Sequence, residues 1–447
     1  MRAHEIQTVS LEDSAVPATL ISPSVFEDEG CGHYKLPPRQ VANELIDAYF
    51  ERVHVLYPFL HEGSFRAHYE QLWADPDFSR PSETSWLALA NLVFAYGCEF
   101  CRAGQTDEFD KHALAFIERA KSIILSLVFR SADLPLVQAL LLLCHYLQGT
   151  LALNECWNFA GLMIRNAISI GLHVNPTDDG NLLPVEKESR KRLWWGCLVL
   201  DRTLCMKLGR PPSIRSTDAH EVDLPLEVDD QYIVDTSLVP PQPSGRPSRI
   251  SFFVQTIKQS HIIDCILAKV YLANPKVQKR QDQTLLSHRT DESSVLGDAF
   301  LLDGQLQAWW NEMPPHLREE PALPDGIDFQ RQRRVMRIRF LQIRLLLQRP
   351  IFLLFSKDQI NDEFMRAGAI ASSRVCVSAA QETIQLIHQG YNRQLLNSLW
   401  YNLHCKCSSP FNWGFDSRAS RCVHLSGRSY DSSGDGKVFT QPVVATT

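Results

Sequence analysis

The feature that most constrains this chain is a helical spacing of apolar residues that returns along most of its length. In its first instance the spacing places Leu45, Ile46, Tyr49, Phe50 and Val53 at intervals of three and four positions, on one side of an α-helix. A strand would send every second one of these side chains to the opposite face, whereas a helix keeps them together. The spacing therefore predicts helices that bury one face against other helices.

Further helical stripes follow, and almost no segment shows the period of two that a half-buried strand needs. The predicted helices cover residues 64–73, 86–100, 112–127, 134–150, 157–172, 186–204, 252–272, 294–312, 331–355 and 366–389. The fold class predicted from this pattern is all-α.

Proline and glycine interrupt the helical pattern near the middle of the chain. Pro240, Pro241, Pro243, Gly245 and Pro247 make residues 226–250 unable to hold a helix, so we interpret this stretch as a loop between two helical lobes. The predicted organisation is a disordered or weakly ordered N-terminus at 1–36, a domain at 37–404 and a disordered tail at 405–447. Within the domain, lobe one covers 37–225 and lobe two covers 251–404.

The charge and the hydropathy of the chain speak against several classes of function. The chain has 447 residues, with 45 Lys and Arg against 51 Asp and Glu, and a formal net charge of −6. Phosphate backbones attract a local excess of Lys and Arg, so the chain alone is not expected to bind nucleic acid. No secretory signal opens the sequence and no apolar run approaches about 20 residues, which predicts a protein that stays inside the cell and does not span a membrane.

The 12 cysteines do not form a recognisable metal site. Cys98 and Cys101 make an isolated CxxC, and Cys405 and Cys407 an isolated CxC, but neither has a second pair at a spacing that closes a tetrahedral zinc shell. Most of the others lie in apolar helical stripes, as Cys144 does, and we interpret them as small hydrophobic residues. No metal or other cofactor is therefore assigned to any residue of this chain.

Catalytic motifs are missing from the sequence. It contains no Gly-rich phosphate loop, no HExxH and no GxSxG. Asp178 and Asp179 sit beside Pro176, and Asp229 and Asp230 lie in the proline-rich stretch, so neither acidic pair recurs on a helix where metal-bridging carboxylates would converge. We predict that the chain is not an enzyme.

One segment of the chain carries a dense signature. Residues 188–225 include ESRKRLWWGCLVLDRTLCMKLGRPPSI, whose signature positions are Arg192, Trp194, Trp195, Asp201, Arg202, Gly209, Arg210, Pro211 and Pro212. Other pieces keep a fixed order around it, with AYFERVHVLYPFLHEGSF at 48–65, WNFAGLMIRNAISIGLHVNP at 157–176 and FLQIRLLLQRPIF at 340–352. In this ordered set the chain resembles, over about residues 41–401, the regulatory domain or middle homology region of fungal binuclear zinc cluster transcription factors, such as xylanolytic activators.

The resemblance implies an α-helical domain that lies C-terminal to a binuclear zinc cluster, in a nuclear regulator of RNA polymerase II transcription. That cluster uses six cysteines in a run that opens CxxCx6C, whereas Cys31 is the only cysteine here before Cys98. Zinc would therefore belong to a cluster missing from this chain, and we expect a misread exon boundary or a truncation at both ends. DNA contact would come through the missing cluster or through a full-length relative.

The resemblance also implies partners for the domain. They are the transcription machinery, a second chain in a homo- or heterodimer, and a small-molecule effector taken up by a cavity between helices or at a partner surface. Two alternatives stay open: a partner that has no DNA-binding domain and modulates full-length relatives, and, less favoured, a helical enzyme. No residue identifies the effector, the target genes or the sign of regulation.

The signature residues have a structural and a functional interpretation. Trp194 and Trp195 supply large packing surfaces, while Asp201 and Arg202 are tolerated inside a helix only if they are hydrogen-bonded or paired across helices. A structural role is favoured over contact with an effector, because a buried charge usually belongs to a paired network. In the turn that follows, Arg210 is expected to cap helix carbonyls.

A basic stripe runs along the predicted helix at residues 331–355. Arg333, Arg337 and Arg344 lie on one helical face between two apolar stripes. We interpret them as the solvated edge of a mostly buried helix, because a net charge of −6 does not favour phosphate binding.

Overall fold

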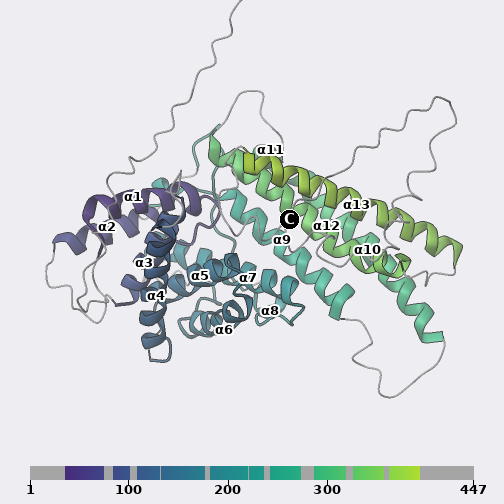
Figure 1. The fold of residues 1–447 in the computed structure, drawn as a ribbon, viewed down its shortest axis with the longest axis horizontal. Helices are drawn as coiled ribbons and strands as arrows, with labels where there is room; N and C mark the ends of the chain where they lie inside the picture. The colour runs from purple at the N-terminus through teal and green to yellow at the C-terminus, as the bar shows by residue number, and fades with distance from the viewer. Residues whose placement is uncertain are drawn as a thin grey trace, which may run out of the picture.

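The computed structural model of the chain is all-α over the residues that it describes (Figure 1). These are residues 36–74, 84–100, 108–130, 132–176, 182–219, 221–235, 242–272, 286–318, 326–356 and 362–392. Within these ranges every regular element is a helix and none is a strand, so the predicted fold class is confirmed. The predictions for the N-terminus at 1–36 and the tail at 405–447 concern positions outside the described residues, apart from Leu36 itself.

The helices predicted from the apolar spacing are all present. In chain order the elements up to the signature are α1 (Arg39–Tyr49), the π-helix η3 (Phe50–His54), α2 (Glu62–Ala74), α3 (Thr84–Phe100), α4 (Glu108–Leu127), α5 (Leu134–Gly149), α6 (Leu153–Ser169) and α7 (Pro184–Leu208). After it come α8 (Ser216–Ala219), the 3-10 turn η5 (Asp230–Tyr232), α9 (Ser251–Ile266), the π-helix η6 (Leu267–Leu272), α10 (Leu286–Glu312), α11 (Pro315–Arg318), α12 (Ile327–Ser356) and α13 (Glu363–Asn392). Observed ends differ from the predicted ones by a few residues, most of all at the start of α10.

Helices α1, α3 and α5 pack closely in the N-terminal half of the chain. A Cβ at Gly97 of α3 would lie 2.3 Å from the carbonyl oxygen of Leu45, so the crossing of α3 over α1 requires glycine. Asp133 begins α5, because its carboxylate accepts the N–H of Leu136 at 2.8 Å. The same carboxylate accepts the hydroxyl of Ser85 at 2.8 Å, which joins the start of α5 to the start of α3.

Helix α12 runs along the C-terminal half, and α13 lies beside it (Figure 1). Pro350 lies inside α12 and has no N–H to donate to the carbonyl of Leu346. The hydroxyl of Tyr271, in η6, donates to that carbonyl at 2.7 Å instead. The acceptor is therefore paired, and the helix continues through the proline as predicted.

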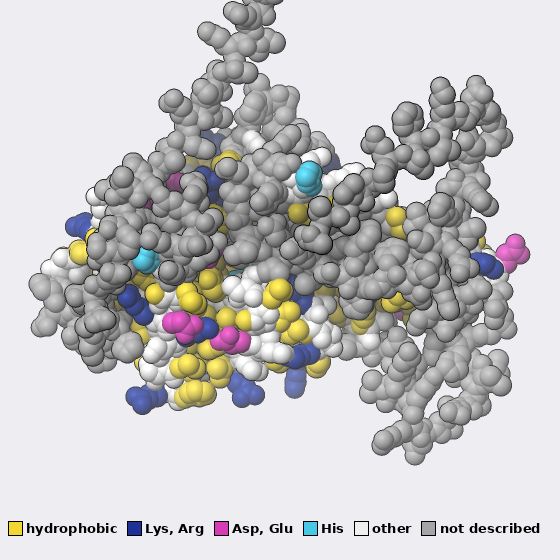
Figure 2. All heavy atoms as spheres, in the orientation of Figure 1, with side chains coloured by type: hydrophobic (Ala, Val, Ile, Leu, Met, Phe, Trp, Pro, Cys, Tyr) yellow, Lys and Arg dark blue, Asp and Glu magenta, His cyan; other side chains and the backbone are white. Residues whose placement is uncertain are grey.

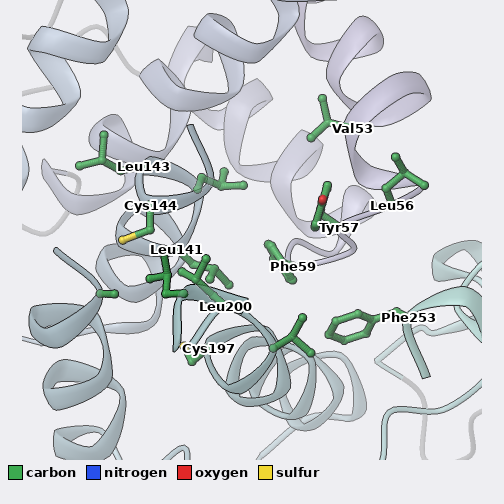
Figure 3. Close-up of a cluster of buried hydrophobic side chains, with 14 of the residues drawn as sticks. Val53, Leu56, Tyr57, Phe59, Leu141, Leu143, Cys144, Cys197, Leu200 and Phe253 are labelled. Atoms are coloured by element: carbon green, nitrogen blue, oxygen red, sulfur yellow. The ribbon is translucent and has the colours of Figure 1, made fainter. Parts of the chain in front are cut away.

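The hydrophobic core is shared between the two halves of the chain. Figure 3 shows the region where they meet, with Phe59 next to Leu141 of α5 and Leu200 of α7 on one side and Phe253 of α9 on the other. The rings of Phe59 and Phe253 meet edge-on, with centroids 5.9 Å apart. Because one hydrophobic cluster contains buried residues from both sides of the proline-rich stretch, the predicted division into two lobes is not confirmed.

The stretch predicted as an interlobe loop, residues 226–250, is partly described. Residues 236–241 lie outside the described part, and the rest is irregular apart from η5. Val228 and Ile233 are buried and pack against Val185 near the start of α7. The part of this stretch around Val228 and Ile233 is thus packed on the signature helix rather than held away from it.

The surface described by the structure mixes side chains of all kinds. On the face in Figure 2, hydrophobic, basic and acidic side chains are interspersed over the coloured part, and several Lys or Arg side chains follow its lower edge. Among the helices described, none combines the length and the apolar composition that crossing a membrane requires.

Candidate functional site

The two signature tryptophans lie on α7 and face different neighbours. Trp194 is fully buried, and its ring packs against that of His173 with centroids 6.2 Å apart. Trp195 is 2% exposed, and its indole N–H donates to the carbonyl of Asp223 at 3.0 Å. Its ring also meets the ring of His261 in α9 edge-on. Trp195 therefore contacts both the segment that folds back over α7 and the C-terminal half.

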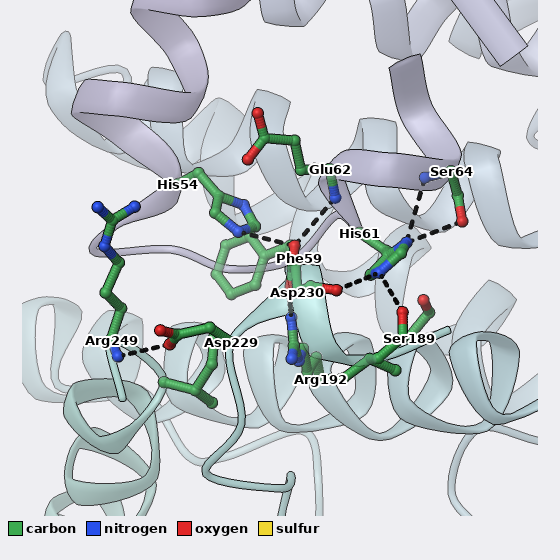
Figure 4. A network of polar contacts seen from close by, with 12 residues as sticks. His54, Phe59, His61, Glu62, Ser64, Ser189, Arg192, Asp229, Asp230 and Arg249 are labelled. Carbon is green, nitrogen blue, oxygen red and sulfur yellow. Dashed lines mark hydrogen bonds and ion pairs between the residues drawn. The ribbon is translucent and has the colours of Figure 1, made fainter. Parts of the chain in front are cut away.

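Arg192 lies at the centre of a buried ion-pair network (Figure 4). The residue is 1% exposed, and its guanidinium donates to Glu188 Oε1 at 3.0 Å and to Asp230 Oδ1 at 2.5 Å. Glu188, one turn earlier on α7, also accepts the N–H of Leu226 at 3.0 Å. Burial raises the pKa of Glu188, and the charge of Arg192 offsets only part of that effect. We call Arg192, Glu188 and Asp230 the Arg192 clamp, since they hold residues 226–230 on α7.

Asp230 extends the Arg192 clamp to the start of α2. Its Oδ2 accepts the N–H of Glu62 at 2.9 Å and lies 3.2 Å from His54 Nε2 in η3 (Figure 4). Its backbone carbonyl lies 3.2 Å from His61 Nε2. Burial alone would raise the pKa of Asp230, but Arg192 and His54 outweigh it and hold that pKa well below its usual range. Asp230 is therefore a carboxylate that joins α7, η3 and α2.

Asp201 and Arg202 form a second buried pair further along α7. Asp201 accepts the backbone N–H groups of Ser213 at 3.0 Å and Ile214 at 3.1 Å. Arg202 donates to Asp201 at 2.7 Å, and its Nε lies 2.9 Å from Asp264 of α9. Burial raises the pKa of Asp201, although the Ile214 N–H and Arg202 act against it. We call these contacts the Asp201–Arg202 clamp. Arg202 is paired across helices with Asp264, whereas Asp201 is held by backbone N–H groups and by Arg202 beside it on α7.

The turn between α7 and its clamped return segment begins at Gly209. This residue has a left-handed backbone, with φ of +64°, and its N–H donates to the carbonyl of Cys205 at 2.9 Å. Pro211 and Pro212 then prevent the helix from continuing. Asp201 binds the chain directly after the two prolines. The turn and the Asp201–Arg202 clamp therefore act on the same short stretch.

The prediction that Arg210 caps helix carbonyls is wrong. Its guanidinium reaches across to α6, where it lies 5.1 Å from the centroid of the Trp157 ring and donates to Asn154 Oδ1 at 2.8 Å. Another arginine has the capping role, because Arg190 of α7 donates to the carbonyl of Ile170 at the end of α6 at 2.6 Å. Spacing in the sequence does not tell which arginine caps a helix and which contacts side chains, because both roles depend on where α6 lies.

The structure brings the signature residues together as two clamps and a turn on one helix. The sequence pointed to Asp201 and Arg202, because charged residues inside an apolar helix need partners, and to Arg192 only as a position of the signature. It does not identify the partners Asp230 and Asp264, and it suggests for Asp230 only a test as a metal ligand. The only signal in the sequence was that both residues are acidic.

A cavity of about 50 Å³ lies beside α7. Its walls come from both halves of the chain: it is lined by Tyr57, His145, Gln148, Val199, Thr203, Met206, Thr256, Gln259, Ser260, Ile263, Arg339, Gln342 and Ile343. The helix that carries both clamps thus also forms one wall of the cavity. The sequence predicted an effector cavity between helices but identified none of these residues.

The polar wall of the cavity is basic. Arg339 of α12 donates to the hydroxyl of Thr256 at 2.8 Å and to that of Tyr57 at 3.2 Å. Burial, together with Arg339 and Lys207, lowers the pKa of His145 to about 3, so the imidazole on this wall is neutral at pH 7. Among the described residues that line the cavity, none is acidic.

Three buried glutamines, Gln148, Gln259 and Gln342, also line the cavity. Gln259 is 2% exposed, and its Nε2 has no hydrogen-bond partner within the part of the chain that the structure describes. An unsatisfied buried donor costs about 1–3 kcal/mol. An acceptor placed in the cavity would therefore be stabilising.

The arginines of the basic stripe are all hydrogen-bonded, and the predicted solvated edge holds only in part: Arg333 is buried, whereas the side chains of Arg337 and Arg344 are 32% and 24% exposed. Arg333 is 8% exposed and donates to a backbone carbonyl at 2.9 Å. Arg337 binds Glu382 of α13 through two bonds of 2.5 and 2.8 Å, and Arg344 binds Asp303 of α10 at 2.9 and 3.0 Å. The acidic partners lie on neighbouring helices, where the spacing within α12 could not show them.

The residues described do not fit the zinc that the resemblance implies. Within the described ranges, no three His, Cys, Asp or Glu side chains come together as a metal site. Cys98 is buried in α3, while Cys101, the CxC at 405–407 and the pair Asp178 and Asp179 lie outside those ranges.

Comparisons with known proteins agree on one family. The chain matches the fungal specific transcription factor domain over residues 46–311. It is 29% identical to Transcription factor FBD3 of Gibberella moniliformis over 372 residues, which are 79% of this chain and 46% of that protein. It is 25% identical to Activator of stress genes 1 of Saccharomyces cerevisiae over 372 residues, 82% of this chain and 37% of that protein. It is 29% identical to the ABC-transporter-regulating transcription factor of Aspergillus oryzae over 287 residues, 64% of this chain and 30% of that protein. The chain thus spans less than half the length of these curated relatives.

Proposed function

The chain belongs to the fungal specific transcription factor domain family, and we propose that it is the regulatory domain of a transcription regulator that acts in the nucleus. The family match over residues 46–311 carries this proposal, because both clamps of α7 lie inside it. The relatives are named as transcription factors and as an activator, which supports a regulatory rather than a catalytic role.

DNA contact in this proposal is made by a binuclear zinc cluster, either elsewhere in the same protein or on a full-length partner in a dimer. The net charge of −6 supports this separation, because strong binding to phosphates needs an excess of Lys and Arg. The domain would then act on the transcription machinery by changing the surface that the DNA-bound complex presents to it.

In this proposal α7 couples the two halves of the domain. The Arg192 clamp connects α7 to η3 and α2, and the Asp201–Arg202 clamp connects it to α9. The cavity is lined by α7, α9 and α12, so an effector in it contacts both halves. Such an effector shifts the domain between two arrangements only as far as it binds one better than the other. We propose that the signature residues hold these elements together and do not touch the effector.

A tethered reporter tests the regulatory role. The full chain is fused to a bacterial repressor's DNA-binding domain, and a reporter with the matching operator is measured in a fungal host. We expect the fusion to change reporter output several-fold relative to the DNA-binding domain alone. An Arg192→Met fusion should lose this effect, because the Arg192 clamp is broken, while the matched Arg190→Met fusion should keep it. Reporter output equal to that of the DNA-binding domain alone, with the fusion present in the nucleus, would reject the proposed function.

A further inference from the structure

The cavity beside α7 has the charge of an anion site. Arg339 lines it, and the lining residues that the structure describes include neither Asp nor Glu. Lys207 lies close enough to act with Arg339 against protonation of His145, which lowers the pKa of that imidazole. Positive charge with little water around it attracts an anion more strongly than the same charge in bulk solvent.

Hydrogen-bond donors also converge on this cavity. The guanidinium of Arg339 is oriented by the hydroxyls of Thr256 and Tyr57, at 2.8 and 3.2 Å. A guanidinium presents five donors in a planar fork that matches the two oxygens of a carboxylate. The Nε2 of Gln259 adds a buried donor that has no partner among the described residues. These groups complement an acceptor with two oxygens.

The size and the apolar lining of the cavity limit what fits. A cavity of about 50 Å³ has room for about four water molecules, or for an organic molecule of a few non-hydrogen atoms. Val199, Ile263 and Ile343 supply apolar surface to the same cavity. One arginine and a short apolar wall suit a single carboxylate with a short alkyl chain.

The cavity has a route to solvent on one side. Thr203, Met206 and Arg339 are partly exposed, whereas the other lining residues are buried. A ligand can therefore enter between α7 and α12.

We propose that this cavity binds a monocarboxylate of two to four carbons, with the carboxylate on Arg339 and Gln259 and the alkyl chain against Val199 and Ile263. The inference rests on the proposed function, since the bound acid would be the effector of the regulatory domain. Helices from both halves form the walls, so the bound acid holds the halves in one arrangement.

Thermal unfolding and isothermal titration of the full chain test this site. Acetate, propionate and butyrate are compared with acetamide, propionamide and butyramide, which have nearly the same shape and no charge, at constant ionic strength. At ten times its Kd, the best acid should raise Tm by about 2 °C, and its amide should leave Tm unchanged. Equal effects of acid and amide, or no shift with any of the three acids, would overturn the proposal and leave a water-filled cavity.

Substitutions locate the binding in the cavity. Arg339→Gln and Gln259→Glu should each weaken binding of the acid at least tenfold, the first by removing the cation and the second by adding a like charge. Arg337→Gln is the matched control, because it removes the same charge from the same helix at a contact with Glu382 outside the cavity, and it should change Kd less than twofold. If Arg339→Gln does not fold, the affinity of Gln259→Glu for the acid tests the site alone. Unchanged affinity in the folded variants would overturn the assignment.

The ligand and the function fail separately. If the chain binds none of the acids but the tethered reporter still responds, the proposed ligand is rejected and the proposed regulatory role stands. If the chain binds an acid but does not change the reporter output, the proposed regulatory role is rejected and the proposed binding site stands.

Discussion

Replacing Arg192 by methionine removes one charge from the Arg192 clamp and keeps most of the side-chain volume. The two carboxylates that share Arg192 stay buried, with side-chain exposures of 4% for Glu188 and 10% for Asp230. Both lose their main cation. The variant therefore leaves buried negative charge in place of a paired network.

The expected cost follows from the charges that remain. Breaking a buried pair by removing one partner costs about 3–5 kcal/mol. Glu188 relieves part of this cost by taking up a proton, because burial already raises its pKa. We therefore expect Arg192→Met to lose about 4 kcal/mol of unfolding free energy at pH 7, and less at pH 5, where protonated carboxyls no longer need the cation.

Thermal unfolding of the full chain, followed by circular dichroism, measures this loss as a fall in Tm of about 5 °C or more. Arg190→Met is the control, because it removes an arginine from the same helix whose side chain is 20% exposed, and it should cost about 1 kcal/mol or less. Adding Glu188→Gln and Asp230→Asn to Arg192→Met should recover half of the loss or more, since no buried charge is then left without a partner. Equal Tm values for the Arg192 and Arg190 variants, or no recovery in the triple variant, would refute the reasoning.

Three further predictions test other contacts. Burial is the main reason that the folded pKa of His145 is lowered to about 3, below about 6.5 in the unfolded chain, so its stability contribution is complete above pH 6.5 and is lost as pH falls toward 3. His145→Gln should remove up to about 1.4 kcal/mol per pH unit from the slope of stability in that window, and an unchanged slope would contradict a buried neutral imidazole. Gly97→Ala places a Cβ 2.3 Å from a backbone oxygen of α1 and should lower Tm by several degrees, whereas Gly161→Ala meets nothing within 4 Å and should gain about 0.5–1 kcal/mol. Similar Tm changes for the two alanines would argue against the close crossing of α1 and α3. Tyr271→Phe should cost about 1–3 kcal/mol in thermal unfolding, because it leaves the Leu346 carbonyl next to the helix proline unpaired, and a neutral result would show that another donor replaces the hydroxyl.

The helices were predictable because each buries a face whose spacing is local in the sequence. In α1 the predicted stripe of Leu45, Ile46 and Tyr49 is buried. The π-helix that follows was not predictable, because Phe50 and Val53 fit an α-helical stripe equally well and only the backbone hydrogen bonds differ.

The functional residues were predictable only where the sequence of a single helix shows a residue that needs a partner. Asp201 and Arg202 stand out as charges within an apolar helix, and Arg192 belongs to the signature. Their partners do not, because Asp230 lies 38 residues from Arg192 and its pairing depends on how the return segment folds. The cavity was beyond prediction for the same reason: Gln259 and Arg339 become neighbours only when α9 packs against α12.

Transcript sequencing after deletion of the gene tests most directly whether this domain regulates transcription. The deletion strain is complemented with the wild-type chain in its genomic context or with the Arg192→Met variant, and protein levels are matched. The account predicts that a defined set of transcripts changes on deletion, returns with the wild type and does not return with Arg192→Met. Transcript levels that are the same in all strains, under conditions in which the wild-type protein is present in the nucleus, would contradict it.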